Sequence, residues 1–221
     1  MQAGSTTRPS IQWLDSAARY GLVSRMLHWG MVALMVWQFM PMLACRIFGE
    51  SVSAFLYRLS IGHGTLGTSI LLLVLVRGGW GLLNLRRRRN NRRARAAWAA
   101  MAVHLLLYAL MFAIPTLALL RIYGSGPAVD LFGFPVAGPT GARIEWIVRI
   151  ADLAHGTLAW TLLVLAVGHG VMALFHHCVL KDDTLLRMAS QSRRPGARPC
   201  AKPLASTSTR DPSDVAYETC R

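Results

Sequence analysis

The sequence has little acidic charge and little charge overall, and both deficits narrow the protein classes to which it can belong. Asp and Glu together number 10, and charged residues make up only 15% of the 221-residue chain, whereas soluble domains average about 25%. A soluble globular enzyme is therefore a poor match. The hydrophobic content of 53% also argues against a disordered chain and favours a membrane protein.

Cysteine is scarce as well, and its spacing excludes two further classes. The four cysteines, at positions 45, 178, 200 and 220, form no C-x-x-C pair. A disulfide framework is therefore unsupported, and so is covalent haem attachment through C-x-x-C-H.

What the chain does have is four long apolar stretches, over residues 22–45, 61–85, 96–120 and 151–180. Each reaches the roughly 20 residues that a helix needs to cross a bilayer. Backbone polar groups find no water in lipid, so such runs must be helical. We therefore predict an all-α fold, a bundle of four transmembrane helices.

Basic residues are unequally divided between the two sides of these spans. One side, comprising the N-terminal arm, the Arg-rich 86–95 loop and the C-terminal region, carries 18 of the 24 Lys and Arg, and the other carries 5. The positive-inside rule then places both termini in the cytoplasm. This bias explains the net charge of +14 without a nucleic-acid partner, because no aromatic residues interleave the Arg run. Anionic lipid headgroups are the expected contact instead.

The segments outside the spans suggest three regions. Residues 1–20 are predicted to form a cytoplasmic arm, residues 21–188 the helical domain, and residues 189–221 a disordered basic tail rich in Ser, Thr, Pro and Arg. The external loop 121–150 has turn signals at 124–127 and 132–135. A short interfacial helix is expected near 142–150.

All seven histidines lie within or at the edges of the apolar spans, where ionisable residues are costly and generally functional. His155 and His169 share the fourth span and are 14 residues apart. That spacing separates them by about 21 Å along a helix but by only about 40° around it. One helix face therefore presents two imidazoles, one near each membrane surface.

Each of these histidines has a candidate partner at its own depth on another span. His28 lies near the cytoplasmic start of the first span, at the level of His169, and His63 lies at the external start of the second, at the level of His155. Two pairs follow, one per leaflet. Zinc would need three or four ligands at each site, whereas two axial imidazoles suit a non-covalent haem b.

Glycines surround these histidines and admit two interpretations. They lie at positions 62, 64 and 67 around His63, at 156 after His155, and at 168 and 170 on either side of His169. Small residues let a macrocycle approach the backbone, but they also serve close helix–helix contact in membranes.

At these residues the sequence resembles the prokaryotic cytochrome b561 family of four-helix, di-haem b proteins of the bacterial inner membrane. The resemblance spans roughly residues 20–188. It includes the R-M-L-H-W motif at 25–29, His63 with Gly67 and Arg77, His104 with Pro115, and the A-L-F-H-H and D-D-T-L-L-R-M motifs at 173–177 and 182–188.

The resemblance implies a function and a ligand set. Two haems b would be held by His28, His63, His155 and His169, the histidines already paired by depth. It implies single-electron transfer in a multi-pass inner-membrane protein, with quinone as the lipid-phase partner. The other redox partner is not visible in the sequence; superoxide is one candidate donor, and a quinone-linked oxidoreductase one form of the activity. A non-redox haem sensor, assembly or anchor subunit is the alternative.

Two further residues are candidate cofactor-binding groups. His104 could contact a haem propionate or a quinone carbonyl, or it could anchor the membrane interface. Arg77 could pair with a propionate, or it could extend toward the Arg-rich loop. His176 and His177 are expected to be interfacial.

The sequence also departs from the family pattern at two positions. Gly81 stands where a second Arg is frequent, and Gly156 stands where a carboxylate often follows the histidine. The second departure puts in doubt a carboxylate-assisted proton step at the outer haem.

Overall fold

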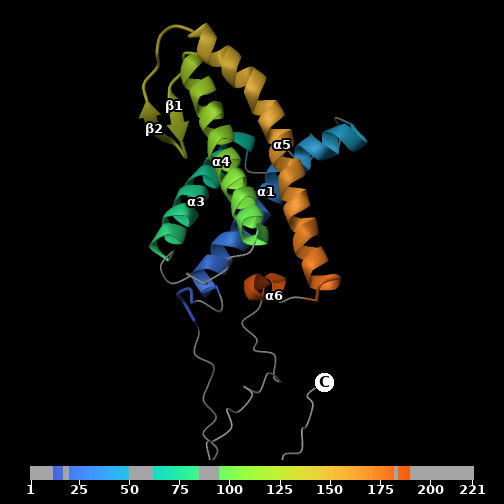
Figure 1. Ribbon diagram of the computed structural model, residues 1–221. Coiled ribbons are helices and arrows are strands. Elements are labelled where there is room, and N and C mark those ends of the chain that lie inside the picture. The colour runs from blue at the N-terminus through green and yellow to red at the C-terminus, as the bar shows by residue number, and fades with distance from the viewer. Residues whose placement is uncertain (1–11, 17–19, 50–61, 85–94, 182–183, 190–221) are drawn as a thin grey trace, which may run out of the picture. The chain divides into compact units, whose positions relative to one another are not determined.

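The computed structural model describes residues 12–16, 20–49, 62–84, 95–181 and 184–189, and its main elements are four long helices (Figure 1). The helices are α1 (Leu22–Phe48), α3 (His63–Leu83), α4 (Arg95–Gly124) and α5 (Glu145–Cys178). All four are long and apolar enough to span a membrane, by length and composition. The predicted four-span all-α fold is therefore confirmed.

The boundaries of the helices differ from the prediction mainly at α5. The expected short interfacial helix at 142–150 is not separate, because α5 begins at Glu145 and continues without a break. A charged first turn interrupts the apolar pattern but does not interrupt the backbone hydrogen bonds of the helix. Pro41 and Pro115 both lie inside assigned helices, as prolines do when neighbouring helices satisfy the freed backbone groups.

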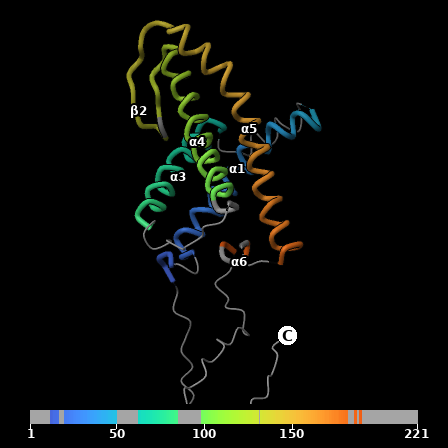
Figure 2. Tube along the Cα trace, viewed as in Figure 1, coloured from blue at the N-terminus to red at the C-terminus, as the bar shows by residue number. Residues whose placement is uncertain are grey.

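The chain path places helices that follow one another in the sequence side by side. Contact is most extensive between α4 and α5, and α1 packs on α3 and α3 on α4; the ribbon and the Cα tube show these helices from one side (Figures 1 and 2). The buried core draws on all four helices. Its members are Met31, Ile70, Val74, Leu107, Leu110, Met111, Ile114 and Leu162.

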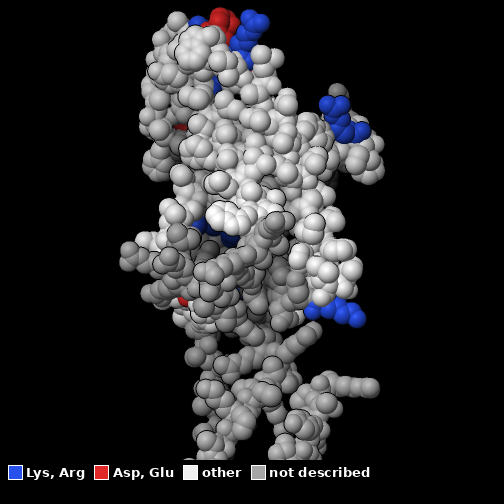
Figure 3. All heavy atoms as spheres, in the orientation of Figure 1, with Lys and Arg blue, Asp and Glu red and all other residues white. Residues whose placement is uncertain are grey.

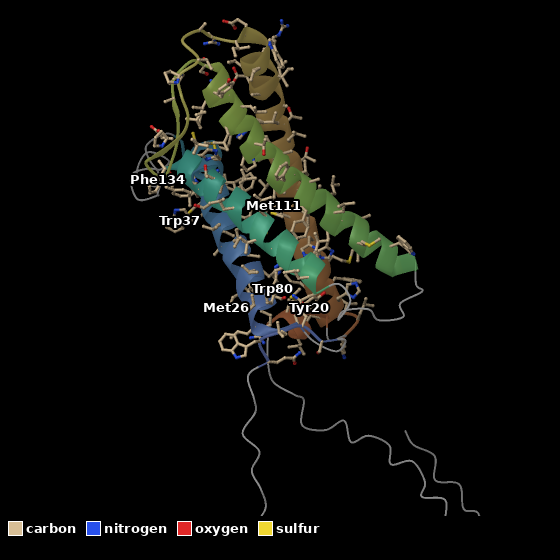
Figure 4. All side chains as sticks on the ribbon, turned by 90° about the vertical axis from the view of Figure 1, so that its left-hand side faces the viewer. Tyr20, Met26, Trp37, Trp80, Met111 and Phe134 are labelled. Carbon is tan, nitrogen blue, oxygen red and sulfur yellow. The ribbon has the colours of Figure 1, made fainter. Side chains whose placement is uncertain are left out.

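This core lies between two levels of histidine. Leu162 is seven residues from His155 and seven from His169 on α5, and it is 4% exposed. Met111, from α4, is labelled midway along the helices in Figure 4. Much of the remaining helix surface is apolar and exposed, and Figure 3 shows a broad band with few charged side chains on the face in view. Such a surface suits a lipid environment.

A β-hairpin connects α4 to α5 and was not predicted. Strands β1 (Val129–Leu131) and β2 (Phe134–Ala137) pair antiparallel. Phe132 and Gly133 form the two-residue turn with φ of 54° and 82°, which corresponds to a type I′ turn. Only turns were expected at 132–135, because strands of three and four residues leave almost no alternation to detect. A short helix, α6 (Thr184–Ala189), follows α5.

The segment before α1 folds back over the N-terminus of that helix. Asp15 is 4% exposed, and its Oδ1 accepts a hydrogen bond of 2.7 Å from the Gly21 N–H. The Gln12 carbonyl accepts one of 2.8 Å from the Leu22 N–H. A carboxylate at this position satisfies an orphan donor and complements the positive end of the helix.

Glycine is required at position 21 by this close approach. A Cβ there would lie 2.3 Å from the Trp13 carbonyl oxygen and 2.6 Å from the Leu14 carbonyl carbon. Both obstacles are backbone atoms, so a side-chain rotation cannot relieve the overlap.

Gly21→Ala is therefore expected to lower thermal stability in detergent by the equivalent of about 1–3 kcal/mol, the usual cost of overpacking. Gly78→Ala on α3 is the matched control, because nothing described lies within 4 Å of a Cβ at that position. The midpoint of thermal unfolding of Gly21→Ala should lie clearly below that of Gly78→Ala. Equal midpoints would show that the arm is not held against α1.

Candidate functional site

The structure brings His63 and His155 together at the hairpin end of the bundle. Their ring centroids are 6.3 Å apart, with an angle of 65° between the ring planes. His63 is the first residue of α3 and His155 lies three turns into α5. The pair predicted from depth on the two spans is thus an adjacent pair in space.

Gln38, from the middle of α1, holds His63 in place. Its amide nitrogen lies 3.2 Å from His63 Nε2 and 3.1 Å from the His63 carbonyl oxygen. Two buried side-chain atoms have no hydrogen-bond partner within the described residues, Gln38 Oε1 and His155 Nδ1. Buried polar atoms are seldom left unsatisfied, and both atoms belong to this one group.

These three side chains line a cavity of about 240 Å³ between the helices and the hairpin. Most of the wall is apolar, from α1, α3, α4 and α5, while Asp130 and Phe132 from the hairpin complete it. Figure 4 shows the hairpin, marked by Phe134, beside the upper part of the helices. Although Gly156 stands where a carboxylate often follows the histidine, Asp130 places a carboxylate in the lining of the same cavity as His155.

The geometry of this end suits a metal held between two imidazoles. Nitrogens bound on opposite sides of one metal, each at about 2.0 Å as in other His–metal bonds, put the ring centroids roughly 6 Å apart. The observed 6.3 Å agrees. No group of three or more His, Cys, Asp or Glu suited to a bare metal ion occurs in the described part of the chain.

The glycines near the histidines make little close contact with neighbouring helices in the described part of the chain. A Cβ at Gly64, Gly156, Gly168 or Gly170 would meet no described atom within 4 Å. At Gly67 it would lie 3.5 Å from the Gln38 amide nitrogen, and Gly64 and Gly67 both line the cavity. Among the described residues, tight helix–helix packing through Gly64, Gly156, Gly168 and Gly170 is therefore absent.

The second group of candidate residues lies toward the opposite end of the helices. His28 is half-buried, and its electrostatic neighbours are Arg77, His169 and His104. The ring of His169 lies 5.0 Å from that of His104 at 79°, and His28 has Trp29 as its ring neighbour, at 5.7 Å. The structure thus gathers the predicted pair into one group but gives His169 its closest ring contact with His104.

Arg77 points into the bundle at this end. Its Nε donates to the Tyr108 hydroxyl over 2.6 Å, and its Nη1 donates to the Ser24 carbonyl over 3.3 Å. Trp80 Nε1 donates to Ser24 Oγ at 2.9 Å, and these residues line a small cavity of about 40 Å³ with Tyr20 and Met188. The alternative in which Arg77 extends toward the Arg-rich loop stays a prediction. Most of that loop lies outside the described residues.

The other histidines lie at the margins of the two groups. His104 is exposed, and its Nδ1 lies 2.6 Å from the Ala100 carbonyl oxygen. His176 and His177 are half-buried in the last turn of α5. The predicted tail at 189–221 lies outside the described residues except for Ala189.

Sequence reasoning missed Gln38, Asp130 and Tyr108. Gln38 gave one signal, a polar amide in the middle of an apolar span, which is costly unless it has a partner. Asp130 and Tyr108 gave no signal, because their relevance depends on a hairpin and on a cross-helix contact with Arg77.

Comparison with known proteins identifies a family that matches most of this chain. A family model described as prokaryotic cytochrome b561 matches residues 19–191. Cytochrome b561 homolog 2 of Escherichia coli strain K12 is 29% identical over 194 residues, covering 82% of this chain and 97% of that protein.

Two shorter matches are of the same kind. Cytochrome b561 homolog 1 of Escherichia coli strain K12 is 36% identical over 95 residues, 42% of this chain and 53% of that protein. A probable superoxide oxidase of Yersinia pestis is 32% identical over 93 residues, 41% of this chain and 51% of that protein. With the family model covering most of its length, the chain belongs to the prokaryotic cytochrome b561 family, the multi-pass membrane cytochromes of electron transfer.

Proposed function

We propose that the protein carries single electrons between two haems b, one at each end of the bundle, and exchanges them with quinone. The observation that carries the proposal is the His63–His155 ring separation of 6.3 Å, at which both imidazoles would be able to hold one haem iron. Bound there, haem supplies one-electron redox chemistry. If His63 and His155 both held the iron, oxygen would find no free position there, and haem at this site would serve electron transfer in preference to oxygenation.

At the other end, His28 and His169 are the proposed ligands. They share an electrostatic neighbourhood with Arg77, whose guanidinium is already directed into the bundle by Tyr108. A half-buried cation within an apolar span favours an anionic group nearby, and a haem propionate is a carboxylate that can meet it. Arg77 therefore contributes to binding and orientation, while the two imidazoles supply the metal–nitrogen bonds.

A quinone site near this second group is proposed from its exposed polar groups. His104 faces outward from α4 within ring contact of His169, so a lipid-soluble ring could reach it from the bilayer. Its Nδ1 is engaged with the Ala100 carbonyl, which leaves Nε2 as the nitrogen available to a quinone oxygen. Under the proposed orientation, with both termini in the cytoplasm, this site lies in the cytoplasmic leaflet.

Loss of one ligand should remove one haem. His63→Ala or His155→Ala should reduce haem from two per chain toward one, and His28→Ala or His169→Ala should remove the other haem instead. Pyridine haemochrome content and the visible spectrum of each purified variant measure this. The wild-type protein also distinguishes an electron carrier from a non-redox membrane module. The visible spectrum of a carrier must change to the reduced form on addition of quinol, and a redox titration must give two potentials.

His177→Ala is the matched control for these variants, because it removes an imidazole from the same helix α5 outside both groups. It should retain two low-spin haems. A ligand variant that also keeps both haems would exclude that histidine as a ligand.

His104→Leu should slow quinol oxidation or quinone reduction about 10-fold or more while both haem spectra stay intact, since it removes a polar contact but no ligand. Stopped-flow reduction by a short-chain quinol gives the rate. A variant lacking one haem would instead make His104 the axial partner of His169. Unchanged rates, with slow rates in Asp130→Asn, would move the quinone site to the hairpin end.

Superoxide is a second candidate electron donor, favoured by the name of the relative from Yersinia pestis. Two superoxide anions would give up two electrons and become O₂, while one quinone gains those electrons and two protons and becomes quinol. Haem reduction on addition of superoxide, abolished by superoxide dismutase, would identify this donor. Absence of reduction by superoxide in protein that quinol reduces would exclude it.

A further inference from the structure

The cavity that His63 and His155 line opens beside the hairpin. Most of its described lining is buried or half-buried, but two residues at the start of α3, one near the end of α4 and two of the hairpin are exposed to the outside as well. These are Gly64, Thr65, Ile122, Asp130 and Phe132. The three segments therefore border the opening, and a solute that enters the cavity from this side passes the hairpin.

The hairpin presents one of its two sides to this opening. Asp130 and Phe132 are two positions apart and both line the cavity, as alternate residues of an extended strand share a side. Phe134 pairs with position 131, which puts it on the opposite side; it is 74% exposed and is not among the described lining residues. The base of the hairpin is fixed, because Val129 is 6% exposed and β1 contacts α4.

Phe132 holds its position at a conformational cost. Its φ is 54°, in the left-handed region, which Asn, Asp and Gly adopt readily in a type I′ turn and which a bulky side chain rarely adopts. Strain of this kind persists where the surroundings hold the residue in place, and it gathers at ligand clamps and switch regions. An Asn would serve the turn better, so what Phe132 contributes is its ring at the edge of the cavity.

Asp130 gives the opening a negative charge. It is the only Asp, Glu, Lys or Arg among the described residues that line the cavity, and it has no ion-pair partner within the described part of the chain. The two carboxylates of α5 differ from it, because Asp152 is paired with Arg121 and Glu145 with Arg143, outside the lining. Apolar walls focus the field of a charge at such an opening, so Asp130 repels anions and attracts cations there.

We propose that the hairpin is a selectivity gate for small redox solutes at this end of the bundle, in which Phe132 limits their size and Asp130 selects against anions. Neutral and cationic electron donors and acceptors therefore reach this end more readily than anions of the same size, and superoxide, as an anion, meets the same repulsion. The inference rests on the proposed haem between His63 and His155, since that haem is what these solutes reach.

Thiol labelling measures entry into the cavity independently of haem. In full-length protein with its four native cysteines replaced by serine, Ala118→Cys introduces one thiol into the lining from α4. The thiol is labelled with two methanethiosulfonate reagents of similar size, one carrying a trimethylammonium group and the other a sulfonate. The ratio of the two rates measures the charge at the entrance, because the intrinsic reactivity of the thiol cancels.

Asp130→Asn should lower this cation-to-anion rate ratio about 3–10-fold at low salt. The effect should fade toward 1 M salt, because the screening length shortens from about 10 Å at 0.1 M to about 3 Å. Glu145→Gln is the matched control, since it makes the same charge change at an exposed position outside the lining, and it should leave the ratio nearly unchanged. A wild-type ratio in Asp130→Asn, or an equal change in Glu145→Gln, would overturn the role of Asp130.

Phe132→Asn tests the ring separately. Asn suits the left-handed turn, so the hairpin is retained while the aromatic ring is lost. Both reagents should then label the thiol several-fold faster, with their ratio unchanged. Phe134→Asn is the control on the other side of the hairpin and should label at wild-type rates. Wild-type labelling rates in Phe132→Asn would show that the ring does not limit entry.

Haem-loaded protein tests whether electrons are exchanged through the same gate. Reduced protein is mixed with tris(phenanthroline)cobalt(III), a cation, or with ferricyanide, an anion, each of which takes one electron from a ferrous haem. Asp130→Asn should lower the cation-to-anion ratio of the reoxidation rates, as it does in labelling. Unchanged reoxidation beside changed labelling would overturn the gate in electron exchange. Protein that binds no haem would instead remove the proposed function, and the labelling ratios would still decide whether the hairpin selects by charge.

Discussion

The separation of 14 residues between the two histidines of α5 is the constraint on which the arrangement depends. It places two imidazoles on one helix face, about 21 Å apart along the axis, so a single rigid element serves both groups. The same spacing recurs on α3, where Arg77 lies 14 residues after His63. Two helices therefore carry polar groups to the same two levels, and Leu162 with its apolar neighbours fills the level between them.

This division keeps polar groups near the ends of the spans and leaves the middle to close packing. Burying an ionisable group is tolerated where it has partners, and each of the two groups provides several. Gln38 meets His63 at one end, and Tyr108 with Ser24 meets Arg77 at the other. The apolar core supplies stability, and the polar groups supply the positions of the candidate ligands.

The fold was predictable because one physical rule governs each span. A run of about 20 apolar residues must be helical in lipid, and 100° per residue then fixes which histidines share a face. The boundary of α5 was less predictable, because a charged turn at Glu145 resembles a break. The hairpin was not predictable as strands, since its two strands have only three and four residues.

The candidate site could be predicted only in part, for a different reason. The pairing of His63 with His155 follows from depth, but the contact of Gln38 with His63 joins residues 25 positions apart on different helices. No pattern along the chain encodes that contact. The contact of His104 with His169 likewise depends on how α4 rotates against α5, which hydrophobic periodicity leaves open in a helix that is apolar all round.

Arg77 makes the electrostatic potential differ between the two ends of the bundle. A fixed positive charge held away from bulk water lowers the energy of an added electron near it, and the effect falls with distance. An electron placed near His28 and His169 is within the influence of this guanidinium, whereas one near His63 and His155 is three to four helical turns away along α3. The Arg77 charge therefore lowers the energy of an added electron at this end of the bundle more than at the His63–His155 end. This difference exists before any partner binds.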